Sequence, residues 1–277
     1  MESIRQHTPG SRTSPGRAMA ALAVTATIGI ALAVGGLSYS GQAAPSDPAQ
    51  ERPDRCHQPG PYQLPHGGEE VDLDPGDFSH RITNEYWPMR PGTTWRLREG
   101  SKANGQTVKL TVLERTRMVR GIRARIIHDV VRQDGEIVEN TFDWYAQDSG
   151  GSVWYLGEFS REYEDGVPVS TEGSWEYGVG GAQAGVVVPA VPKPGCTYRQ
   201  EFLAGEAEDY ASILSIREDL DLRVGEFPDV LSTGDYVGLE PGVVEHKFFA
   251  RGVGPVLSQH ISPSGGREVL VAHSPAD

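Results

Sequence analysis

The fold is decided by one stretch of the chain, residues 143–158, which reads DWYAQDSGGSVWYLGE. Aromatic and β-branched residues, which favour strands, stand on both sides of a Ser-Gly-Gly-Ser segment that is typical of a tight turn. The stretch therefore predicts a β-hairpin with Asp143 and Glu158 near its two outer ends. The main functional question is whether these carboxylates form a site or only keep a sheet soluble.

Strand patterns continue along the chain on both sides of this hairpin. Gln133-Asp134-Gly135-Glu136 and Ser264-Gly265-Gly266 are further turn signals, and only residues 206–217 have some helical character, although they fit another strand equally well. Strands do not alternate with helices, which excludes a parallel sheet. The expected strands are 107–113, 122–131, 137–147, 153–162, 196–202, 243–250, 256–261 and 268–272. The sequence thus predicts a mainly β fold with little helix, namely a single strongly curved antiparallel sheet or barrel, mostly hairpin-connected.

The N-terminus has the organisation of a secretory signal peptide. Residues 1–17 are basic, residues 18–37 are apolar, and Gly41-Gln42-Ala43 is a small-x-small cleavage site. We therefore expect export beyond the cytoplasmic membrane, as a secreted or cell-envelope protein, with cleavage after Ala43 and no stable membrane insertion afterwards. An uncleaved N-terminal membrane anchor is the alternative, because the apolar run is just long enough to span a bilayer.

Composition divides the rest of the chain. Residues 44–76 are rich in Pro and Gly and have no apolar periodicity, which predicts a largely irregular linker. Residues 77–272 are expected to form one β-rich domain, and residues 273–277 a tail.

Cys56 and Cys196 are the only cysteines, and export would place them in an oxidising compartment. We expect a disulfide between them, which would tie the linker to the folded domain; two unpaired thiols are the alternative. Two cysteines without CxxC spacing do not indicate a zinc site, and we predict no metal.

The chain is acidic, which excludes several classes of partner. Its formal charge of −13 becomes −15 when residues 1–43 are removed. Such a surface repels nucleic acid, so no nucleic-acid partner is expected. The chain also lacks a phosphate-binding glycine loop followed by a helix pattern, and the sequence predicts no cofactor.

Three segments resemble a known group of proteins. NEYWPMRPGTTWRL (84–97) is similar to the opening of secreted bacterial β-rich domains, with Tyr-aromatic-Pro, then Pro-Gly, then Trp, and FFARGVGPVLSQ (248–259) is similar to their closing strands. DWYAQD with VWYLGE resembles the central hairpin of one uncharacterised exported set within that group. The resemblance implies a curved antiparallel sheet in an exported protein. The set has no known activity, so it implies no functional residues.

Turn chemistry predicts how the strands pair. If Asp134-Gly135 and Gly150-Gly151 are two-residue loops, Asp143 lies directly opposite Glu158. A three-residue loop at the second turn would shift that register by one residue and reverse the faces.

One face of the sheet in this register carries the candidate site. Ile126 is expected opposite Asp143, and His128 one diagonal step away. The expected walls of a ligand pocket are Tyr145, Trp154, Leu156 and Ile126, with Asp143, Glu158 and His128 orienting a polar end.

The preferred function is binding of an apolar or amphipathic small molecule within the curved sheet. The alternative is a carboxylate-based hydrolase or lyase in which Asp143 and Glu158 act as an acid and base or nucleophile and His128 shuttles protons. A third possibility is a solvated scaffold face without a site. No Gly-x-Ser-x-Gly nucleophile motif occurs in the chain.

Overall fold

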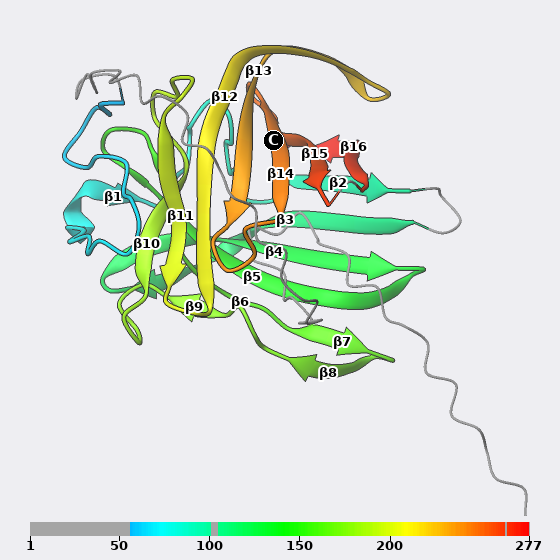
Figure 1. Cartoon of the computed structure of the whole chain (residues 1–277), viewed down its shortest axis with the longest axis horizontal. Helices are drawn as coiled ribbons and strands as arrows, with labels where there is room; N and C mark the ends of the chain where they lie inside the picture. Colours follow the sequence, from blue (N-terminus) through cyan, green and yellow to red (C-terminus); the bar gives the residue numbers. More distant parts are fainter. Residues whose placement is uncertain (1–55, 101–104, 264, 277) are drawn as a thin grey trace, which may run out of the picture.

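The computed structural model describes residues 56–100, 105–263 and 265–276 (Figure 1). The predicted signal peptide and the first part of the predicted linker lie outside these residues. No helix of the described part is long and apolar enough to cross a membrane. The elements are a 3₁₀ turn, η1 (Pro75–Asp77), and the strands β1 (Phe78–Ser79), β2 (Thr94–Glu99), β3 (Gln106–Val119), β4 (Ile122–Gln133), β5 (Glu136–Asp148), β6 (Val153–Phe159), β7 (Glu162–Glu164), β8 (Val167–Ser170), β9 (Trp175–Glu176), β10 (Gln183–Val188), β11 (Thr197–Leu203), β12 (Ala207–Leu222), β13 (Gly225–Val237), β14 (Val244–Ala250), β15 (Gly254–Ser262) and β16 (Arg267–Ser274).

Twelve of these strands form a closed antiparallel barrel (Figure 1). Each strand pairs with its neighbours in the order β5-β4-β3-β2-β16-β15-β14-β13-β12-β11-β10-β6, and β6 pairs with β5 to close the ring. The predicted mainly β fold, with a single curved antiparallel sheet or barrel, is therefore confirmed. Closure leaves no unpaired strand edge in the barrel wall.

Several strands of the barrel wall differ from the sequence prediction. Residues 206–217, which had some helical character, are mostly strand β12. The wall strands β2, β10 and β13 were not predicted at all, and β16 continues to Ser274, two residues into the predicted tail. The far ends of β12 and β13 bend away from the wall and reach over towards β15 and β16 (Figure 1).

The segment before β1 lies against the outside of the barrel. From Cys56 to Asp74 it has no helix or strand, but Leu64 and Leu73 in it are buried. The predicted disulfide joins Cys56 to Cys196, which immediately precedes β11. This bond links the segment to the barrel wall across 140 residues of sequence.

The β4–β5 hairpin begins in the predicted register and then departs from it. Gln133 pairs with Glu136 across the Asp134-Gly135 turn, as expected, and both turn residues have the positive φ of a tight hairpin. A bulge then places Val131 opposite Glu139, which shifts every later pair by one residue.

The β5–β6 hairpin has two irregularities that offset each other. Its loop is one residue longer than predicted, because the amide of Asp148 bonds to the carbonyl of Ser152, and Tyr145 therefore pairs with Tyr155. A second register shift follows, at Gly157, whose φ of 132° favours glycine. Asp143 consequently does lie opposite Glu158, as predicted, although the pairs nearer the loop are shifted.

Candidate functional site

Asp143 and Glu158 lie on the inside of the barrel, where β5 meets β6. They are cross-strand partners and are only 3% and 1% exposed. The hydroxyl of Tyr155 donates a hydrogen bond of 2.8 Å to Asp143 Oδ1. Strands β5 and β6 thus bring two carboxyls together in a place that water barely reaches.

These two residues belong to a larger group of buried carboxyls that we call the inner carboxyl cluster. Its members come from strands around the barrel and are at most 8% exposed. Three of them, Asp129, Glu158 and Glu268, have no hydrogen-bond partner for either oxygen within the described residues, and Asp209 and Glu201 each have one such oxygen. The cluster consists of Asp129 on β4, Asp143 on β5, Glu158 on β6, Glu201 on β11, Asp209 on β12 and Glu268 on β16.

The cluster residues influence one another although they lie on different strands of the barrel. Burial raises the pKa of Asp129 well above its usual range, and the charges of Glu139, Asp143 and Glu268 raise this pKa further. Strand β16, which carries Glu268, is separated from β4 by β2 and β3 in the wall. The influence of Glu268 on Asp129 therefore extends across two intervening strands.

Burial also raises the pKa of Asp143 to about 7. The pKa of Glu158 is raised well above its usual range by burial first, and then by Glu201 and Asp143. Burial raises the pKa of Asp209 to about 7 as well, although Lys247 opposes this shift. Near neutral pH the cluster therefore holds protons that exposed carboxylates would have lost.

Lys247 on β14 is a buried cation at the edge of this cluster. Burial alone would lower its pKa, but the nearby charges of Asp235 and Glu245 outweigh burial and raise it. Its Nζ lies 3.0 Å from Asp235 and 3.5 Å from Glu245. Lys247 is thus already committed to two carboxylates, and no described basic residue forms an ion pair with a member of the cluster.

An aromatic cluster borders the carboxyls. Tyr145 stacks on Tyr155 with ring centroids 4.8 Å apart, and Tyr155 meets the edge of Trp175 at 5.2 Å. On its other side Tyr145 contacts Trp87, which in turn contacts Phe249 from the opposite wall. We call these five residues the inner aromatic cluster. The interior therefore has an aromatic part and an acidic part that meet at Tyr155.

The structure keeps only part of the predicted site together. Tyr145, Asp143 and Glu158 share the interior as expected. The prediction was wrong for Trp154, because the extra loop residue pairs it with Ala146 and turns it outward against Tyr62 and Phe78. Strand alternation also places Leu156 on the other side from Tyr155.

The prediction was also wrong for Ile126 and His128, for a similar reason. The bulge in the β4–β5 hairpin puts Ile127, not Ile126, opposite Asp143. His128 pairs with Phe142 and stacks on its ring at 4.4 Å on the outer face, where its Nε2 lies 2.8 Å from Asn140 Oδ1. His128 therefore cannot exchange protons with the Asp143–Glu158 pair.

Sequence reasoning missed most of the inner carboxyl cluster. A further bulge between Arg199 and Glu201 separates two residues that strand alternation would place on one face. Arg199 points outward to the carbonyls of Gly67, Glu69 and Ala184, whereas Glu201 accepts a hydrogen bond of 2.6 Å from Trp175 Nε1. One available signal was the position of Asp129 and Glu268 within apolar strand sequences, HDVV and REVLV.

Comparison with known proteins gives little further information. No protein-family model matches the chain, and neither does any curated protein sequence. Two crystal structures are similar in chain path: a protein proposed to be exported, with a YmcC-like fold, from Bacteroides fragilis, and a proposed lipoprotein from Parabacteroides distasonis. The first is 12% identical over 70% of this chain and all of its own, with a TM-score of 0.38. The second is 12% identical over 69% of this chain and 99% of its own, with a TM-score of 0.39. At this level of similarity neither assigns an activity or a location to this chain.

Proposed function

We propose that the protein is exported and that its barrel binds a small amphipathic molecule with a positively charged, amine-type end. The observation that carries this proposal is the inner carboxyl cluster, in which buried oxygens of five carboxyls have no partner among the described residues: Asp129, Glu158, Glu201, Asp209 and Glu268. A buried carboxyl without a partner is costly, and it must take up either a proton or a cation. A cationic ligand would supply the missing partner.

The chemistry of the ligand's other end follows from the aromatic residues. Ammonium groups are attracted to the faces of Tyr and Trp rings, and an apolar tail is favoured beside them. Because Tyr155 contacts both Asp143 and the ring of Tyr145, it lies where the charged and apolar ends of such a ligand would meet. Aromatic rings beside the carboxyls favour an organic cation over a metal ion.

The alternative hydrolase or lyase is less well supported. A substrate bond would have to lie against both Asp143 and Glu158, and these side chains are 3% and 1% exposed. A small ligand held within the barrel is compatible with such burial, whereas a polymeric substrate such as a glycan is not.

The proposal is tested with two probes that share a tail and differ in charge. Octyltrimethylammonium is expected to bind saturably and to change the tryptophan fluorescence, whereas octanoate is not expected to bind. The affinity for the cation is expected to rise with pH through about 7, because the cation replaces protons on Asp143 and Asp209. Calorimetric titration with each probe at several pH values measures both effects.

Amide variants locate the binding site. The double variant Asp143→Asn/Glu158→Gln keeps the shape of the protonated carboxyls, so it is expected to fold and to bind the cation at least about tenfold more weakly, a loss of roughly 1.4 kcal/mol. The control is Asp134→Asn/Glu136→Gln, which removes the same charge from the exposed β4–β5 turn. Equal binding of octanoate, or equal affinity in the two variants, would disprove the proposal.

A further inference from the structure

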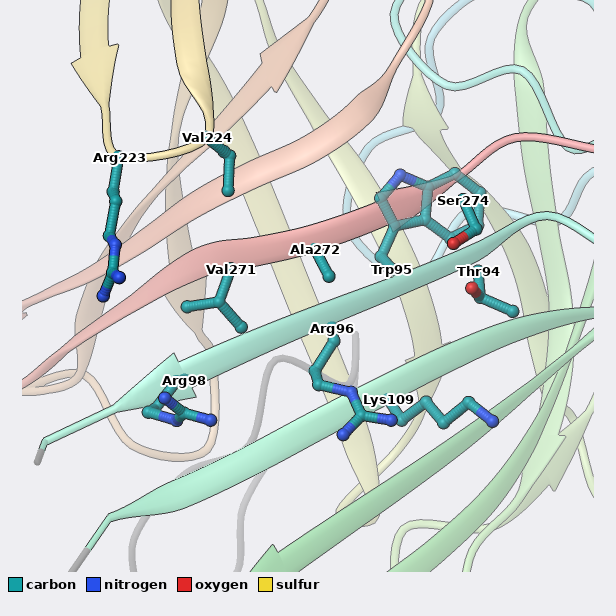
Figure 2. A pocket seen from close by; sticks show the side chains of 10 residues that line it. All are labelled: Thr94, Trp95, Arg96, Arg98, Lys109, Arg223, Val224, Val271, Ala272 and Ser274. Carbon is teal, nitrogen blue, oxygen red and sulfur yellow. The ribbon is translucent and has the colours of Figure 1, made fainter. Parts of the chain in front are cut away.

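A groove of about 670 Å³ lies on the outside of the barrel. Its charged lining residues are basic, whereas the inner carboxyl cluster is acidic. Figure 2 shows Arg96 and Arg98 projecting into the groove from β2 and Lys109 from β3. Arg223 and Val224, at the tip of the β12–β13 hairpin, form its opposite side (Figure 2). The long hairpin thus adds a fourth cation to three that belong to the barrel wall.

The cations on the wall lie close together because of strand register. Arg96 on β2 is the direct cross-strand partner of Lys109 on β3, and Arg98 is one diagonal step from Lys109. Like charges directly opposite each other on antiparallel strands are destabilising. A negative charge between these side chains would relieve this repulsion.

No such charge is provided by the described part of the chain. None of the four cations forms an ion pair or side-chain hydrogen bond with another described residue, and none of the described residues that line the groove is acidic. This is unusual for a chain with a formal charge of −13, in which acidic residues outnumber basic ones. The groove therefore differs in charge from the rest of this acidic protein, and its four cations have no acidic partner among the described residues.

We propose that this groove binds clustered phosphate groups, carried either by a soluble polyphosphorylated molecule or by lipid head groups. Arg guanidinium groups match phosphate oxygens with two parallel hydrogen bonds, and Lys adds a compact charge. The hydroxyls of Thr94 and Ser274, which also line the groove, provide further donors. A volume of about 670 Å³ is larger than one phosphate requires and lies within the range of small-molecule sites.

The proposal is independent of the ligand inside the barrel and is tested with two sources of phosphate. Inorganic tripolyphosphate is titrated calorimetrically, and sedimentation measures binding to phosphatidylcholine vesicles with and without phosphatidylglycerol. Saturable binding of tripolyphosphate that weakens with added salt supports a soluble source, and binding only to the phosphatidylglycerol vesicles supports a lipid source. No binding of either probe would overturn the proposal.

A matched pair of variants decides whether the groove is responsible. Arg96→Gln/Lys109→Gln is expected to weaken binding at least about tenfold without loss of thermal stability, because it removes two like charges that face each other. The control, Arg81→Gln/Arg217→Gln, removes the same charge from exposed residues outside the groove and is expected to bind as the parent protein does. Equal weakening in both variants would indicate attraction by overall charge only and would also overturn the proposal.

Discussion

Raising the pH from 5 to 8 is expected to lower the free energy of unfolding of this protein by at least about 2.5 kcal/mol. The cause is the inner carboxyl cluster, whose members keep their protons in the folded barrel and lose them when the chain unfolds. This is opposite to the behaviour of proteins whose carboxylates form ion pairs and which lose stability in acid.

The sign and size follow from Asp143 alone. Burial raises its folded-state pKa to about 7, whereas in the unfolded chain it titrates near its ordinary value of 3.8. The contribution of Asp143 to the free energy of unfolding is fully present below the unfolded-state pKa. It decreases as the pH rises between the two pKa values and levels off above about 7. Burial raises the pKa of Asp209 to about 7 as well, and the pKa values of Glu158 and Glu201 are also raised. The loss of stability that follows from Asp143 alone is therefore a lower bound for the whole cluster.

Urea unfolding at pH 5 and pH 8 measures this effect. The variant Asp143→Asn/Glu158→Gln cannot titrate at these positions and is expected to lose distinctly less stability over the same range. Asp134→Asn/Glu136→Gln, in the exposed turn, is expected to lose as much as the parent protein. A free energy of unfolding that is constant or rises from pH 5 to pH 8 would show that the cluster is ionised in the folded state.

The pH effect and the proposed ligand are linked. A cation that binds the ionised cluster stabilises the folded state by an amount that grows with the logarithm of its concentration above the dissociation constant. Octyltrimethylammonium is therefore expected to restore stability at pH 8 more than at pH 5.

The fold class could be predicted from the sequence because hairpins are local. Turn residues such as Asp134-Gly135 and the alternation of apolar residues beside them determine strand pairing over short distances. The strand β13 was missed because Pro228 and Gly234 interrupt its apolar pattern, and both residues are normally unfavourable in strands. Its long-range pairing with β12 and β14 compensates for these local preferences.

The site could be predicted only in part, because each bulge changes which face a side chain occupies. The shift at Val131 placed His128 and Ile126 outside, and the longer loop at Ser149–Gly151 turned Trp154 outward. Asp143 opposite Glu158 was recovered because the shift at Gly157 offset that of the loop. Residues such as Asp129 and Glu268, which lie on β4 and β16, join one buried cluster only when the sheet curves into a barrel, which no local pattern specifies.

Removal of the disulfide is expected to have the largest effect of any substitution considered. The bond between Cys56 and Cys196 closes a loop of 140 residues, and the loss of this constraint on the unfolded chain lowers the free energy of unfolding by up to about 5 kcal/mol. Cys196 is 1% exposed, so Cys56→Ala/Cys196→Ala is preferred to serine, which would bury a hydroxyl. Urea unfolding of this variant and of the parent protein under non-reducing conditions measures the difference.

The same variant shows what the disulfide holds in place. Without it, the segment from Cys56 to Asp74 is attached to the barrel by the packing of Leu64 and Leu73 and by hydrogen bonds such as those of Gln58 with Val191. Hydrogen exchange is therefore expected to accelerate first in this segment and around Trp154, which packs against Tyr62, while the interior residues stay protected. A reducing agent should destabilise the parent protein to a similar extent and leave the variant unchanged. A loss of less than about 1 kcal/mol would mean that the unfolded chain keeps the segment near β11 without the bond, because the entropic argument assumes an unfolded chain free of such contacts.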